Sequence, residues 1–150
     1  MRCSIHKISM LFLMFVSATA LLAQANSFFT GKWELNVAKS KFNPPPALKS
    51  ETVTNEGGKT TIEGVAGDGQ PFKWSFSASP GVSVPIEGRE NSTVLEKISG
   101  NTIDHTWKMG EGTSHGHGVL SKDGKTLRYV NNGTNFEGRP LHDVYVFEKR

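Results

Sequence analysis

The sequence predicts an all-β fold, an antiparallel up-and-down β-barrel of about ten short strands. All 16 Gly and all 7 Pro lie after residue 25, and the longest segment there without either is the 12 residues from Lys32 to Asn43. Such closely spaced helix breakers exclude helical bundles, coiled coils and doubly wound α/β folds. Short segments of alternating apolar and polar residues lie between the breakers, and this alternation is typical of antiparallel strands.

The first 25 residues have the pattern of a secretory signal peptide. A basic start is followed by an apolar run from Met10 to Val16, and the segment ends at Ala23-Gln24-Ala25, a pattern of small residues that suits cleavage. The apolar run is shorter than the roughly 20 residues that a spanning helix needs. We therefore expect a single domain over residues 26–150, secreted or periplasmic, with no integral membrane segment after cleavage.

The charge and cysteine content of residues 26–150 exclude several classes of function. These residues carry 15 basic and 14 acidic side chains, so they lack the cationic excess that nucleic-acid binding requires. The single cysteine is Cys3, within the expected leader, so disulfides, thiol nucleophiles and Cys-ligated metals are not expected in the domain. The sequence has no nucleophile elbow, phosphate loop or dinucleotide motif, and we expect neither a cofactor nor catalysis.

Ten segments have the length and alternation of strands. They span residues 28–35, 48–55, 60–66, 72–78, 82–86, 93–98, 102–109, 113–120, 126–131 and 141–148. Between many of them lie turns such as Gly57-Gly58 and Asp123-Gly124, whose residues supply the positive φ angles of tight hairpins. Consecutive strands should therefore pair as a meander. Because ten strands in a flat sheet would expose long edges, closure into a barrel is expected.

The long first connection, residues 36–47, is the one interval without strand character. Ala38 to Lys41 favours a helical turn, and Pro44-Pro45-Pro46 forces an extended segment directly after it. We interpret this connection as a stiff crossing between the first two strands.

Gly31-Lys32-Trp33, on the first expected strand, resembles the G-x-W of lipocalin-like proteins, in which the Trp plugs one end of an up-and-down barrel. The resemblance extends over nearly the whole mature chain to small, secreted, lipocalin-like (calycin-type) bacterial proteins of uncharacterised function. It rests on residues 29–36, 38–42, 44–46, 121–127, 133–135, 138–140 and 144–149. It implies a calycin-type barrel, export, a buried Trp33, and a cation on its ring from Arg128, Arg139 or Arg150.

Two strands supply the candidate ligand-binding residues. In residues 72–77 the three aromatics share one face, and in residues 103–109 a second face carries Ile103, His105, Trp107 and Met109. From these faces we predict that an apolar ligand cavity is lined by Trp74, Phe76, His105 and Trp107. The alternative is that the same residues fill the barrel, since a domain of this size needs most of its large side chains for its core.

His115 and His117 are candidate metal ligands, because positions i and i+2 of a strand share a face. A third ligand would be needed, and His105 qualifies only if the strand register places it on that face. Otherwise the two histidines lie on the surface, and the flanking Gly112, Gly116 and Gly118 allow the backbone to bulge or to be approached closely.

The predicted function is therefore binding of a small, partly apolar molecule by an exported β-barrel. One alternative is an envelope protein-interaction module with a packed interior, and another is a metal-binding protein or metal-assisted enzyme that uses His115 and His117. The carboxylates at polar strand or turn positions are expected to be solvated and form no recognisable catalytic pair. They are Asp104, Glu63, Glu87, Glu90 and Glu96.

Overall fold

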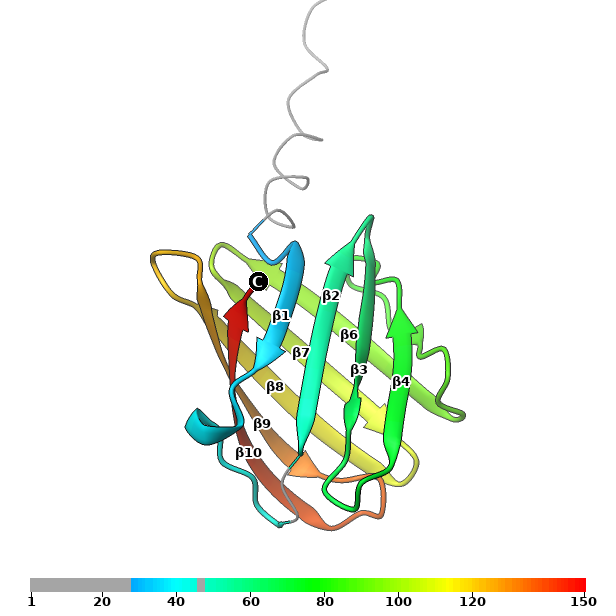
Figure 1. The fold of residues 1–150 in the computed structure, drawn as a ribbon. Helices are drawn as coiled ribbons and strands as arrows, with labels where there is room; N and C mark the ends of the chain where they lie inside the picture. The colour runs from blue at the N-terminus through cyan, green and yellow to red at the C-terminus, as the bar shows by residue number, and fades with distance from the viewer. Residues whose placement is uncertain (1–27, 46–47) are drawn as a thin grey trace, which may run out of the picture.

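The computed structural model describes residues 28–45 and 48–150, which form ten strands and one short 3-10 helix, η1 (Figure 1). The expected signal peptide and Pro46 lie outside the described residues. The strands are β1 (Gly31–Leu35), β2 (Ser50–Glu56), β3 (Lys59–Val65), β4 (Pro71–Phe76), β5 (Val84–Pro85), β6 (Ser92–Ser99), β7 (Thr102–Met109), β8 (Gly112–Leu120), β9 (Thr126–Thr134) and β10 (Pro140–Lys149). All ten predicted strands are confirmed, and their ends differ from the prediction by at most three residues.

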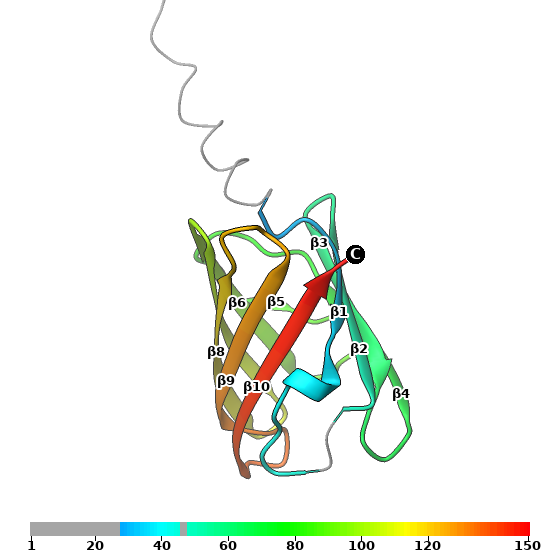
Figure 2. The same ribbon diagram turned by 60° about the vertical axis from the view of Figure 1, so that its left-hand side comes forward.

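The strands form a single antiparallel sheet that curls into a nearly closed barrel (Figures 1 and 2). Its order is β4-β3-β2-β1-β10-β9-β8-β7-β6-β5. The predicted meander is confirmed, except that β4 and β5 form the two edges of the sheet. The chain closes instead through β1 and β10, where Trp33 lies opposite Lys149.

A narrow seam separates the edge strand β4 from the residues that follow β5. One isolated bridge crosses it: the Ser75 amide donates to the Glu87 carbonyl at 3.0 Å, and the Glu87 amide donates to the Ser75 carbonyl at 2.8 Å. The Glu87 carboxylate also accepts hydrogen bonds from the Ser75 hydroxyl (2.9 Å) and the Lys59 ammonium (2.7 Å). These contacts join the two edges of the sheet beside the cavity.

The first connection begins with η1 (Val37–Lys39), which confirms the expected helical turn. The Asn36 side chain caps it by accepting a hydrogen bond from the Lys39 amide at 3.1 Å. The chain then runs beside β10, where Lys41 forms a bridge with Val144 and the His142 amide donates to the Asn43 carbonyl at 2.8 Å. This path brings the Phe42 ring to the barrel interior, where it meets the edge of Tyr145.

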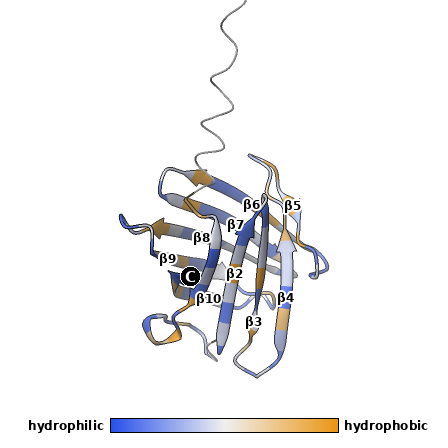
Figure 3. Ribbon diagram, turned by 45° about the horizontal axis from the view of Figure 1, so that its top comes forward, coloured by the Kyte–Doolittle hydropathy of each residue, from blue (hydrophilic) through white to orange (hydrophobic). Residues whose placement is uncertain are grey.

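The strands alternate between an interior and an exterior face, and the colours of Figure 3 change accordingly along the ribbons. In β8, buried and exposed residues alternate over all nine positions. The residues that pair across β7 and β8 show the same division, because His105 lies opposite Gly116 on the interior face. Within the described ranges, no helix is long and apolar enough to cross a membrane.

The apolar core has two parts, and one of them closes an end of the barrel. This closing cluster contains Phe29, Trp33, Ile103, Leu120 and Phe147. Trp33 is only 2% exposed and its indole N–H donates to the Phe29 carbonyl at 2.9 Å, which confirms the predicted burial. The cation over its ring is Lys149, 5.2 Å from the ring centroid. The expectation of an arginine there is wrong, because the β1–β10 register places Lys149 directly beside Trp33.

Candidate ligand-binding cavity

A cavity of about 410 Å³ lies inside the barrel. It falls within the roughly 300–1,000 Å³ typical of small-molecule sites. Its walls are the interior faces of the strands together with Phe42 and Pro44 of the first connection and Arg89 of the β5–β6 connection. The interior is therefore not fully packed, whereas the interaction-module alternative requires a packed interior.

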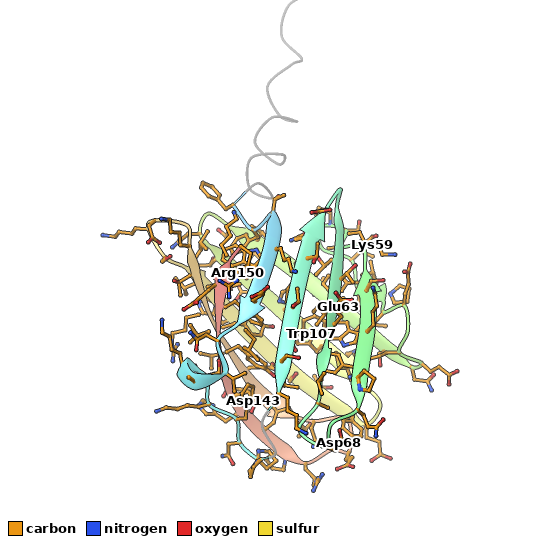
Figure 4. The ribbon with its side chains drawn as sticks, in the orientation of Figure 1. Lys59, Glu63, Asp68, Trp107, Asp143 and Arg150 are labelled. Atoms are coloured by element: carbon orange, nitrogen blue, oxygen red, sulfur yellow. The ribbon has the colours of Figure 1, made fainter. Side chains whose placement is uncertain are left out.

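The four residues predicted to bind ligand all line this cavity, as do residues of the closing cluster at its far end. Figure 4 shows Trp107 inside the barrel. The Trp74 ring meets the Trp107 ring edge-on at 5.5 Å between centroids, and Phe76 meets Trp107 in the same way at 5.7 Å. His105 stacks on Trp107 at 4.7 Å. The structure thus brings the four rings together on one wall, and their part in ligand binding stays a prediction.

Four side chains on this side of the cavity, those of Glu96, His105, Tyr129 and Trp107, form a continuous hydrogen-bonded chain. Glu96 Oε2 lies 3.0 Å from His105 Nε2, and His105 Nδ1 lies 3.1 Å from the Tyr129 hydroxyl. The Trp107 indole N–H donates to that hydroxyl at 2.8 Å. Because the hydroxyl accepts from Trp107, it can donate to His105 Nδ1, and His105 Nε2–H can then donate to Glu96. Each of these four side chains is hydrogen-bonded to another of the four, so the hydrogen bonds hold the His105 and Trp107 rings in place.

Burial favours the neutral form of the Tyr129 phenol. Its pKa is raised well above the ordinary value by burial, and the hydrogen bond from Trp107 opposes this rise only in part. The hydroxyl therefore keeps its proton at neutral pH and remains a hydrogen-bond donor.

Glycines on β8 make room for Tyr129. A side chain at Gly116 would overlap the Tyr129 hydroxyl, and a Cβ at Gly118 would lie 2.7 Å from an Ile103 methyl group. The prediction that these glycines permit close approach is confirmed: Tyr129 of β9 approaches Gly116, and Ile103 of β7 approaches Gly118. Cavity shape on this side thus depends on the absence of side chains along β8.

Acidic groups from β2 and β10 also line the cavity, namely Glu51 and Asp143. Asp143 accepts hydrogen bonds from the Asn43 amide (2.9 Å) and the Tyr145 hydroxyl (3.1 Å). Burial raises the pKa of Asp143, and those two hydrogen bonds oppose the rise. Burial also raises the pKa of Glu51 to about 7; the Arg89 charge opposes this rise and Asp143 adds to it.

Arg89 is the cation of the cavity. Its guanidinium lies over the Trp74 ring, 5.5 Å from the centroid, and Nη1 approaches Met109 Sδ at 3.8 Å. Burial lowers its pKa and the Glu51 charge raises it, although the two side chains form no ion pair. An arginine held by an aromatic face and a thioether keeps its hydrogen-bonding capacity for another partner.

The structure separates the histidines that a metal site would need. His115 and His117 lie exposed on the outer face of β8, whereas His105 faces the cavity. His117 Nδ1 lies 2.6 Å from the Asp104 carboxylate, and His115 contacts the Thr106 hydroxyl at 3.3 Å. No group of three or more potential metal ligands occurs among residues 28–45 and 48–150. The condition that His105 share their face is therefore not met.

Several residues that line the cavity were not predicted from the sequence to bind ligand. The expectation that Glu96 is solvated is wrong, because it faces inward and its side chain is 11% exposed. The signal for it was the alternation of Val94, Glu96 and Ile98 on one face of β6. Glu51, Tyr129, Asp143 and Tyr145 follow similar alternations, whereas Arg89 lies in a connection that has none.

This arrangement, a ten-stranded antiparallel meander in which the first and last strands pair around an apolar cavity, has the fold class of the calycin-type β-barrels. Solved structures support that class. Fatty-acid-binding protein 1 of Echinococcus granulosus is 11% identical, with a TM-score of 0.51 over 82% of this chain and 98% of its own. The wild-type fluorescent protein UnaG is 14% identical, with a TM-score of 0.52 over 83% of this chain and 98% of its own.

These likenesses establish the fold and confirm the calycin-type part of the resemblance found in the sequence. No family model matches the chain, and no curated protein matches it in sequence. Both solved structures share the barrel of the fatty-acid-binding-protein kind, and neither distinguishes a lipocalin in particular.

Proposed function

We propose that this protein is an exported bacterial barrel that binds a small, partly apolar molecule in its interior cavity. The observation that carries the proposal is the cavity of about 410 Å³ lined by aromatic side chains from several strands. A cavity of this size forgoes packing that would stabilise a domain, since unfilled core volume costs about 24 cal/mol per Å³. Binding a ligand in that volume gives a physical reason for its persistence.

Two further observations support the proposal. The solved structures that share the fold include one whose name specifies fatty-acid binding. The expected signal peptide supports the secreted or periplasmic location, because a basic start, an apolar run and a small-residue cleavage pattern are what export requires.

A neutral apolar fluorophore, N-phenyl-1-naphthylamine, tests the binding function. We expect saturable binding at one site, with quenching of tryptophan emission, because Trp74 and Trp107 line the cavity. Val53→Phe places a larger side chain in the cavity and should weaken binding at least tenfold. Thr54→Phe is the matched control, because the next residue of β2 points to the outer face and should leave the affinity unchanged.

The absence of saturable binding to the parent protein would contradict the proposed function. Equal weakening by both variants would show that the fluorophore binds elsewhere or that the substitutions disturb the fold. Export is tested separately, by sequencing the N-terminus of the protein recovered outside the cytoplasm; processing near Asn26 is expected, and an intact Met1 would contradict it.

A further inference from the structure

Two oppositely charged groups in the cavity, Glu51 and Arg89, form no ion pair within the described part of the chain, although each charge acts on the other. Glu51 lines the cavity with no side-chain hydrogen bond or ion pair. The Arg89 guanidinium contacts the Trp74 ring and the Met109 sulfur and makes no direct contact with a carboxylate. The other charged cavity groups are satisfied, since Glu96 pairs with His105 and Asp143 accepts two hydrogen bonds.

The surrounding structure sets the backbone positions of these two residues. Glu51 lies opposite Gly64 of β3, where a Cβ would lie 2.9 Å from the Phe72 ring and closer still to the Ser50 carbonyl. The absence of a side chain at Gly64 therefore lets the Phe72 ring lie close beside β2. Arg89 approaches from the β5–β6 connection, anchored by its own amide, which donates to the Ile86 carbonyl at 3.3 Å.

We propose that the ligand is an amphiphile with a zwitterionic polar end, whose carboxylate binds Arg89 and whose ammonium group binds Glu51. This inference rests on the proposed function and names the ligand class of the same cavity. A ligand with both charges satisfies both protein groups at once, and the rings of the cavity accommodate its apolar body.

Single-charge ligands fit the pair less well. A fatty acid would satisfy Arg89 but bring a second negative charge toward Glu51, and an alkylamine would satisfy Glu51 but be repelled by Arg89. A neutral apolar molecule would remove both charged groups from solvent without offering either of them a hydrogen bond or an opposite charge, which is unfavourable for buried ionic groups. Specificity would thus come from what the cavity rejects as well as from what it binds.

Three probes of equal chain length test this inference by displacement of N-phenyl-1-naphthylamine at pH 7.5. They are 2-aminododecanoic acid, dodecanoic acid and dodecylamine. We expect the amino acid to bind at least tenfold more tightly than either of the others. Glu51→Gln should remove most of its advantage over dodecanoic acid, and Arg89→Gln most of its advantage over dodecylamine.

Matched controls use charges on the outer face. Glu63 forms an ion pair with Lys73 on the outside of β3 and β4, and Arg128 lies exposed on β9. Glu63→Gln and Arg128→Gln should keep the preference for the amino acid. Arg89→Lys, which retains the charge, should restore part of the affinity that Arg89→Gln loses, and circular dichroism of each variant establishes that it is folded.

The outcomes separate this inference from the function on which it rests. Dodecanoic acid binding as tightly as the amino acid, or a preference that survives Glu51→Gln, would overturn the inference while leaving cavity binding intact. If neither the neutral fluorophore nor any of the three probes binds, the proposed function fails and this inference fails with it.

Discussion

The Tyr129 hydroxyl occupies the space where a side chain at position 116 would lie, so Gly116 and Tyr129 form a single packing unit across β8 and β9. From that position the hydroxyl reaches both the His105 ring and the Trp107 indole. The placement of the aromatic wall therefore depends on a residue that has no side chain.

Gly116→Ala is expected to destabilise the domain by about 1–3 kcal/mol or more, because the added methyl group overlaps Tyr129 and forces it out of place. Urea unfolding monitored by circular dichroism measures this. In a Tyr129→Leu background, where the ring and hydroxyl are absent, most of the additional cost should disappear. Equal costs in both backgrounds would show that Gly116 is needed for some other reason.

Tyr129→Phe should cost about 1–3 kcal/mol, because it leaves the buried Trp107 N–H and His105 Nδ1 without their shared partner. Thr106→Val is the control, since it removes an exposed hydroxyl that contacts His115 and should change stability by less than about 0.5 kcal/mol. Comparable unfolding midpoints for the two variants would contradict the role assigned to the hydrogen-bonded chain.

Trp33→Ala should cost about 3–5 kcal/mol, the range for removing a large buried aromatic side chain. Phe28→Ala, five positions earlier and 52% exposed, should cost less than about 0.5 kcal/mol. If denaturant unfolding of Trp33→Ala coincides with that of the parent, Trp33 does not close the end of the barrel.

The raised pKa of Glu51 leads us to predict that the stability of the domain depends on pH. Its pKa is about 7 in the folded protein against an ordinary value of 4.5, so the folded state binds the proton more tightly than the unfolded state. The contribution of the protonated Glu51 carboxyl to the free energy of unfolding is therefore present in full below about pH 4.5 and is lost as the pH rises through about 7. The free energy of unfolding of Glu51→Gln, measured relative to that of the parent, should therefore increase by up to about 3 kcal/mol between pH 4.5 and pH 8.

Urea midpoints of the parent and Glu51→Gln at the two pH values measure this difference, and subtraction removes the effect of other titrating groups. A stability difference between the two proteins that does not change with pH would show that the Glu51 carboxyl is solvated rather than buried in the cavity.

The strands could be predicted from the sequence because their signals are local. Alternation along 103–109 and turns such as Asp123-Gly124 fix strand and hairpin without reference to distant residues, and β7 begins and ends where the alternation predicts. The seam was not predictable, because β5 is only two residues long and its failure to pair with β4 depends on how the whole sheet closes.

The aromatic wall was predictable for the same reason. Trp74, Phe76, His105 and Trp107 lie in strands whose apolar and polar residues alternate clearly along the sequence. The charged groups of the cavity were not. Glu96 faces inward because β6 pairs with β7 in a register that sets it opposite His105, and register is a property of two strands together. Arg89 enters from a connection, so periodicity carries no information about its direction.

The central claim is that the cavity beside the aromatic wall holds the ligand, and the indole N–H resonances of the three tryptophans test it most directly. The Trp107 indole N–H donates a hydrogen bond to the Tyr129 hydroxyl, and the Trp33 indole N–H donates to the Phe29 carbonyl at the closed end. The Trp74 indole N–H has no hydrogen-bond partner within the described residues. On titration with N-phenyl-1-naphthylamine, nitrogen–proton correlation spectra should show large shifts for Trp74 and Trp107 and the smallest for Trp33. Saturable binding that leaves the Trp74 and Trp107 resonances unmoved would contradict the claim.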